Sequence, residues 1–124
     1  MVRCCEADWA RMLKTLFSQL CELEGVNHVR LMDQFGSVLQ STTKWPETSE
    51  EQRFEWAECC RIAEELSLGT LFEVWIEGRR LTLFDRFDND VYVHISGKGG
   101  KKGTWRYELE RLRKNWNSKQ PEAI

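Results

Sequence analysis

The sequence predicts a single α+β domain in which an antiparallel sheet is sandwiched between helices. Three segments carry apolar residues at helical spacing, one near each end of the chain and one in the middle. Two short β-rich runs precede the middle helix and three follow it, each bounded by turn residues. The predicted order of elements is therefore αββαβββα. Neighbouring strands joined by short turns pair antiparallel, so the sheet is expected to be antiparallel. A length of 124 residues suits one domain, 1–124, with a core at about 9–116 and a polar tail at 117–124.

The first helix is predicted over residues 8–24. Asp8 can cap its first turn, and Gly25 can adopt the left-handed conformation that ends a helix. Its apolar residues form one stripe, Trp9, Met12, Leu13, Leu16, Phe17, Leu20 and Leu23.

Two strands, 26–32 and 37–41, follow as a hairpin. The residues between them are Asp33-Gln34-Phe35-Gly36, in which an aspartate opens a tight turn and a glycine closes it. Residues 42–47 are mostly polar and contain Pro46, so we expect a loop there.

The middle helix is predicted to begin at the capping box Thr48-Ser49-Glu50-Glu51 and to end near Leu66. Its apolar residues cover an arc of about 220° around the helix axis, more than one sheet face requires. Such a helix either packs against a second helix in a dimer or enters a deeper monomer core. The residues of the arc are Trp56, Ala57, Cys59, Cys60, Ile62, Ala63 and Leu66.

Three strands are predicted at 71–77, 80–87 and 91–96. Phe72, Val74 and Ile76 line one face of the first, and Leu71 and Trp75 line the other, so both faces of the sheet are expected to be at least partly covered. A lysine-glycine loop at 97–103 leads into a last helix that begins near Thr104. Its apolar stripe is Trp105, Leu109, Leu112 and Trp116.

Charge is unevenly distributed although the net charge is only −2. Residues 1–77 hold 14 acidic and 7 basic residues, whereas residues 78–124 hold 6 and 11. Such a dipole either steers a charged partner or is mixed by folding. A pI of about 5.8 argues against nucleic acid as the main partner. The sequence has no apolar run long enough to cross a membrane and no visible signal peptide, so we expect no membrane insertion and a cytoplasmic location.

No catalytic constellation emerges from the sequence, and we expect a protein that is not an enzyme. The histidines, His28 and His94, are too few to specify a metal site, and the cysteines lack metal-ligand spacing. We therefore expect no metal and no cofactor. The odd number of cysteines argues for reduced thiols; they are Cys4, Cys5, Cys21, Cys59 and Cys60.

The loop at 97–104 lies between a strand and a helix, as phosphate-binding loops do. The P-loop pattern fails because Lys102 stands where a glycine is required. A solvated loop and an anion site remain as alternatives, the latter formed by Lys98, Lys101, Lys102 and Thr104.

Three segments resemble the roadblock family, the dynein-light-chain type of small GTPase regulators and scaffolds. They are LCELEGVNHVRLMDQFGSVLQS with its Gly-Val and its Asp-x-x-Gly turn, the three-strand segment GTLFEVWIEGRRLTLFDRFDNDVYVHIS, and the helix entry GTWRYELERL. The resemblance, over about residues 9–116, implies a roadblock/profilin-like five-stranded antiparallel sheet. It places the first and last helices on one face and the middle helix on the other.

The resemblance also implies a dimer, with itself or a roadblock paralogue, in which the middle helices pack together and the 71–77 strands join into one sheet. The expected function is a non-catalytic dimeric adaptor that binds a Ras-like GTPase and regulates or scaffolds it. Expected interface residues are Trp56, Cys59, Cys60, Ala63, Leu71, Glu73 and Trp75.

Two other functions remain possible on the sequence. One is a secretion-chaperone-like dimer that binds an effector, although such proteins place three strands before the middle helix. The other is a module that binds a phosphorylated ligand through the loop at 97–104.

Overall fold

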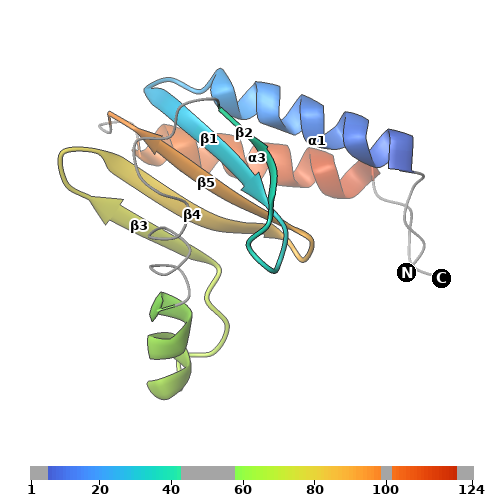
Figure 1. The fold of residues 1–124 in the computed structure, drawn as a ribbon. Helices are drawn as coiled ribbons and strands as arrows, with labels where there is room; N and C mark the ends of the chain where they lie inside the picture. The colour runs from blue at the N-terminus through green and yellow to red at the C-terminus, as the bar shows by residue number, and fades with distance from the viewer. Residues whose placement is uncertain (1–5, 43–57, 99–101, 120–124) are drawn as a thin grey trace.

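The fold was obtained as a computed structural model that describes residues 6–42, 58–98 and 102–119. Within these residues five strands form one antiparallel sheet in the order β2-β1-β5-β4-β3, which confirms the predicted α+β class (Figure 1). The labelled elements are α1 (Glu6–Cys21), β1 (Val26–Met32), β2 (Val38–Ser41), β3 (Glu73–Glu77), β4 (Leu81–Asp88), β5 (Val91–Gly97) and α3 (Lys102–Lys119). Residues 58–65 form a further helical segment between β2 and β3.

Helices α1 and α3 cover the same face of the sheet (Figure 1). The apolar stripes predicted for both helices meet the inward side chains of β1, β4 and β5 in one core. Alternate strand residues therefore point toward these helices, as the two-residue period of a strand requires. The buried core consists of Leu13, Leu16, Leu20, Val29, Leu31, Leu81, Leu83, Phe87, Val91, Val93, Ile95, Trp105, Leu109, Leu112 and Trp116.

The end of α1, the end of β5 and the start of α3 meet around Trp105, whose side chain is fully buried. Its indole N–H donates to the carbonyl of Glu24 at 2.7 Å. The N–H of Lys98 donates to the neighbouring carbonyl of Gly25 at 3.0 Å. A Cβ on Gly97 would lie 2.0 Å from that same Gly25 oxygen, so the close approach of the two backbones requires glycine here.

The predicted end of the first helix is three residues too late. α1 ends at Cys21, and Glu22 and Leu23 donate instead to carbonyls three positions back, at 3.3 and 3.2 Å. This tighter turn leads to Gly25, whose φ of 84° is left-handed as predicted, and directly into β1.

The last helix is longer than predicted at both ends. It begins at Lys102 rather than Thr104 and continues to Lys119, so residues 117–119, expected in the polar tail, are helical. The Ser118 hydroxyl donates to the Asn115 carbonyl at 2.8 Å, and a lysine in the last turn suits the helix dipole. Residues 120–124 lie outside the described residues.

The helical segment 58–65 confirms the second half of the predicted middle helix, whereas its capping box lies outside the described residues. The helix ends in a Schellman motif: Leu68 N–H donates to the Ala63 carbonyl and Ser67 N–H to the Glu64 carbonyl, at 2.9 and 3.0 Å. Ser67, with φ of 55°, takes the left-handed position that glycine usually holds. The helix therefore ends near Leu66, as predicted.

We predict that Gly97→Ala lowers the free energy of unfolding by about 3 kcal/mol or more, because one of the two backbones must move. Gly78→Ala is the matched control, since a Cβ there meets nothing within 4 Å. Its effect is expected to stay within about 0.5 kcal/mol. Urea denaturation followed by circular dichroism measures both, and equal stability of the two variants would contradict the close approach.

Candidate interaction surface

Strand β3 is an outer strand of the sheet. It pairs with β4 in the register Glu73↔Asp85, Trp75↔Leu83 and Glu77↔Leu81. In the part of the chain that the structure describes, no strand pairs with its other edge. Such an edge presents backbone N–H and C=O groups that a further strand can pair with.

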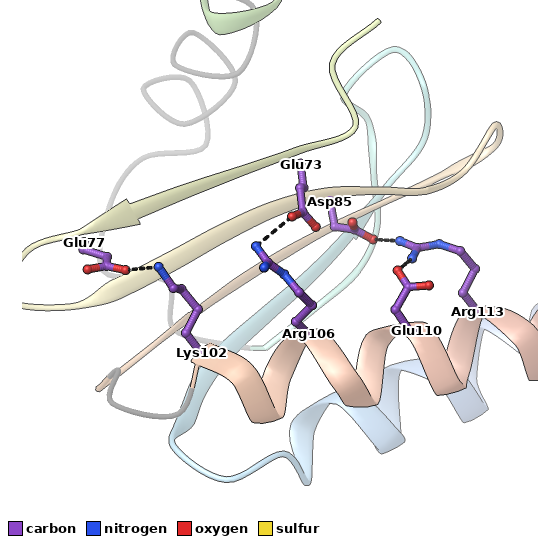
Figure 2. Close-up of polar contacts among 7 residues, drawn as sticks. All are labelled: Glu73, Glu77, Asp85, Lys102, Arg106, Glu110 and Arg113. Carbon is purple, nitrogen blue, oxygen red and sulfur yellow. Dashed lines mark hydrogen bonds and ion pairs between the residues drawn. The ribbon is translucent and has the colours of Figure 1, made fainter.

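One face of β3 is attached to α3 by two ion pairs (Figure 2). Arg106 lies 3.0 Å from the Glu73 carboxylate, and Lys102 pairs with Glu77. Arg106 follows Lys102 by one helical turn, and Glu77 follows Glu73 by four strand residues, so the helix runs along the strand in the opposite direction. Each pair is solvent-exposed and contributes up to about 1 kcal/mol, so the pairs align the strand more than they stabilise the fold.

Trp75 lies between these two ion pairs on the same face of β3. The centroid of its ring is 6.4 Å from that of Trp105, 5.3 Å from the Arg106 guanidinium and 5.9 Å from the Lys102 ammonium. Both cations therefore serve twice, as ion-pair partners and as cation–π partners. The side chain of Trp75 belongs to the contact between β3 and α3.

A third ion pair joins α3 to β4, where Arg113 binds both Asp85 and Glu110 (Figure 2). Asp85 is buried, with 3% of its surface exposed. Arg113 also donates through Nε to the Phe87 carbonyl at 3.2 Å. Burial raises the pKa of the Asp85 carboxyl from 3.8 to about 6, and the nearby Arg113 opposes this rise without cancelling it.

The other face of β3 and the segment leading to it carry exposed apolar side chains. Phe72 is 63% exposed and Ile76 is 39% exposed. The same holds for the side chains of the preceding helix and turn, and we call the full set the apolar patch; its members are Ile62, Leu66, Leu68, Phe72 and Ile76. All five fall within residues 62–76, and exposed apolar surface that is contiguous is typical of a site that binds another protein.

The expected interface residues lie in different environments. Trp56 is outside the described residues. Ala63 is buried, and Cys59, Cys60 and Leu71 are partly buried near the apolar patch. Glu73 and Trp75 face α3, as described above. None of the interface residues expected from the sequence belongs to the apolar patch. Phe72 and Ile76 were nevertheless predicted on one strand face, and Ile62 and Leu66 in the apolar arc of the middle helix.

The helical segment 58–65 lies toward the sheet face opposite α1 and α3. Cys60 and Glu64 line an open pocket of about 520 Å³ together with Arg86 of β4. Arg86 follows Asp85, which points to α3, so the alternation of the strand directs Arg86 to the opposite face. Burial is the largest cause that raises the pKa of the Cys60 thiol, and the neighbouring Cys59 is the second. The raised pKa keeps this thiol protonated.

The expected anion-binding residues come together only in part. Lys98 and Lys102 line a pocket of about 370 Å³ with Arg80, but Lys102 is already paired with Glu77. Lys101 lies outside the described residues, and Thr104 is exposed and does not line this pocket.

The two histidines lie on paired strands, but among the described residues they are not part of a cluster of metal ligands. His94 is fully buried, and its ring stacks on that of Phe84 with 4.0 Å between centroids. Burial, and then Arg30 opposite it on β1, lower the pKa of His94 to about 3. No group of three metal-ligating side chains occurs among residues 6–42, 58–98 and 102–119. No helix in these ranges is long and apolar enough to span a membrane.

Neither a protein-family model nor a curated protein sequence matches the chain. Solved structures do. MglB, a gliding protein from Thermus thermophilus, superposes with a TM-score of 0.67 at 16% identity, over 90% of each chain. A structure described as MglB with tetrameric arrangement gives 0.65 at 16% identity, over 92% of this chain and 90% of that one. A Roadblock/LC7 domain from Streptomyces avermitilis gives 0.62 at 12% identity, over 82% and 91%.

We predict that Asp85 makes the protein more stable as the pH falls. Because the pKa of Asp85 is about 6 in the fold and 3.8 for an ordinary aspartate, the folded state takes up a proton before the unfolded state does. This contribution is complete below 3.8 and is lost as the pH rises through about 6. Between pH 7.5 and pH 5 the wild type should gain about 1 kcal/mol relative to Asp85→Asn.

Chemical denaturation of both proteins at the two pH values measures this difference. Other titrating groups, His94 among them, are present in both proteins and cancel. Parallel pH profiles for wild type and Asp85→Asn would contradict the raised pKa.

Proposed function

From the roadblock/LC7 fold that this chain has, we propose that it is a non-catalytic dimeric adaptor that binds a Ras-like small GTPase and regulates or scaffolds it. The single observation that carries the dimer is the outer edge of β3, which pairs with no other described strand and adjoins the apolar patch. The proposal assigns no catalytic residue to the chain.

The dimer of this proposal is two-fold symmetric, with β3 of one protomer beside β3 of its partner. A two-fold axis brings the same surface of both protomers together, so each apolar residue occurs twice in the contact, once from each protomer. Burying an exposed Leu or Phe contributes about 1.5–3 kcal/mol, and Leu66, Leu68 and Phe72 are each more than 60% exposed. The proposed dimer requires that several such side chains together exceed the cost of association, about 4–15 kcal/mol.

The expected interface residues keep a place in this dimer. Cys59, Cys60, Ala63 and Leu71 are close in sequence to the apolar patch and would border the contact. Trp56 stays a proposed interface residue outside the described residues. Glu73 and Trp75 would contribute through the strand backbone, because their side chains are held by α3.

The GTPase part of the proposal is supported by the family resemblance of the sequence and by the fold shared with MglB. One of these neighbours is described as tetrameric, which supports association between roadblock chains in that protein. A cytoplasmic location belongs to the same proposal.

A second candidate function is the binding of a phosphorylated ligand. The pocket that favours it is lined by Arg80, Lys98 and Lys102, with Glu77 as the one acidic side chain among its lining residues. Isothermal titration with inorganic phosphate and nucleoside phosphates tests it, and no heat at millimolar ligand would exclude this function.

We predict that the double variant Leu66→Ser, Phe72→Ser is a folded monomer while the wild type is a dimer at micromolar concentration. Both side chains are more than 60% exposed, so their loss removes contact between protomers without opening the core. Tyr107→Ser is the control, because Tyr107 is 68% exposed on α3. Size-exclusion chromatography with light scattering measures the mass, and a monomeric wild type would exclude the dimer.

We also predict that the dimer binds a Ras-like GTPase of its own organism with an affinity that depends on the bound nucleotide. Purified GTPases loaded with GDP or a non-hydrolysable GTP analogue can be tested by biolayer interferometry. The monomeric variant should lose at least about tenfold in affinity, since the proposed binding unit is the dimer. Failure of every such GTPase to bind the intact dimer would refute this part of the proposal.

A further inference from the structure

The end of the sheet beside the start of α3 carries two basic side chains at neighbouring positions. In the antiparallel register of β4 with β5, Leu81 pairs with Gly97. Arg80 directly precedes this pair and Lys98 directly follows it, so the two residues lie opposite each other. Like charges at such positions repel each other. Among the described residues, no carboxylate forms an ion pair with Arg80 or Lys98.

A third cation reaches the same place from α3. Lys102 lines the open pocket of about 370 Å³ together with Arg80 and Lys98. We call it the basic pocket; its charged lining residues are Glu77, Arg80, Lys98 and Lys102. Lys102 is also the first residue of α3, whose first turn holds no acidic residue. The positive end of the helix dipole therefore adds to the charge of the three side chains.

The backbone on which these cations stand is held by hydrogen bonds. The β3–β4 turn is closed by the Gly78 N–H, which donates to the Arg80 carbonyl at 3.0 Å. The Lys98 N–H donates to the Gly25 carbonyl, also at 3.0 Å. The side chains of Arg80 and Lys98 are nevertheless exposed. Cations that are already held close together bind an anion with a smaller loss of entropy than cations on a flexible loop.

Glu77 is the carboxylate among the described residues that line the basic pocket, and it pairs with Lys102 (Figure 2). Three cations thus face one carboxylate, which leaves two positive charges uncompensated. A phosphate monoester carries a charge of about −1.5 to −2 at pH 7 and several acceptor oxygens. Such a group matches the remaining charge better than a single carboxylate does.

The Lys102–Glu77 pair can exchange at small cost. The two side chains are 47% and 62% exposed, and exposed ion pairs contribute little to stability. The Lys102 ammonium also lies 5.9 Å from the centroid of the Trp75 ring, a contact that does not involve Glu77. Lys102 therefore stays beside the basic pocket when it moves from Glu77 to another anion.

We propose that the basic pocket binds a phosphate monoester group and that Glu77 is an intramolecular competitor for it. Arg80 and Lys98 bind the phosphate oxygens, and Lys102 leaves Glu77 to bind the same group. Glu77 lowers the affinity in two ways, because it repels the anion and occupies Lys102. This inference rests on the phosphate-binding function proposed above as the second candidate, and it adds how that site is regulated.

The experiment titrates ¹⁵N-labelled full-length protein with inorganic phosphate at constant ionic strength and follows the amide resonances. The wild type should show saturable shifts at residues 77–80, 98 and 102–103, with a dissociation constant on the order of 1 mM. Glu77→Gln should bind at least about fivefold more tightly, because the repulsion is removed and Lys102 is released.

Glu73→Gln is the matched control for Glu77→Gln. It removes the same charge from the same strand, at the ion pair with Arg106, and neither of these residues lines the basic pocket. Its phosphate affinity should stay within about twofold of the wild type, because salt screens charges outside the site.

The basic side chains are tested in the same way. Arg80→Gln and Lys98→Gln should each weaken phosphate binding at least about threefold. Lys114→Gln is their control, since it removes the same charge about 18 Å along α3 from Lys102. The three substituted side chains are exposed, so the variants should fold, and the dispersion of the amide spectrum verifies this.

Two further arms identify the source of the monoester. Glycerol 3-phosphate represents a free ligand and is titrated as above. Vesicles with and without phosphatidic acid represent a lipid headgroup, and cosedimentation measures binding that Arg80→Gln reduces and Lys114→Gln does not. A response in either arm supports a phosphate monoester as the ligand.

The outcomes separate the role of Glu77 from the binding function. Absence of a saturable shift in both the wild type and Glu77→Gln, or shifts centred elsewhere, would overturn the inference together with phosphate binding. Equal affinities of the wild type, Glu77→Gln and Glu73→Gln would overturn the role of Glu77 and leave phosphate binding intact. A monomeric wild type or a failed GTPase titration affects neither result.

Discussion

The burial of Trp105 is the constraint on which the arrangement of this domain depends. Its indole sits where the end of α1, the end of β5 and the start of α3 converge, and its N–H satisfies the Glu24 carbonyl that the early end of α1 leaves available. A buried tryptophan removes about 150–250 Å² of surface from water, which is a large contribution from one side chain to a small core. The same ring supports Trp75 and thereby the edge strand β3.

Folding brings together many of the acidic and basic residues that are segregated along the sequence. The basic residues of α3 come to lie against carboxylates of β3 and β4, through Arg106 with Glu73, Lys102 with Glu77 and Arg113 with Asp85. These contacts align the last helix with the edge strand, while exposed Phe72 and Ile76 lie on the other face.

Two buried titratable groups on opposite faces of the sheet oppose each other in acid. The lowered pKa of His94 contributes stability above its ordinary value of 6.5, and this is lost as the pH falls through about 3. The raised pKa of Asp85 acts in the reverse direction between about 6 and 3.8. The two contributions therefore partly cancel over the mildly acidic range.

The sequence by itself determined the elements, their order and the fold class. Helical periodicity identified α1 and α3, and the Asp33 to Gly36 turn located the first hairpin, because these signals arise from contacts between residues close in the chain. Only the tertiary structure decided which face of β3 is covered. Both faces are apolar, so the two-residue period does not distinguish Trp75, held by α3, from Phe72, left exposed. The close approach at Gly97 and the pairing of Arg106 with Glu73 likewise join segments distant in sequence, and no local pattern encodes such contacts.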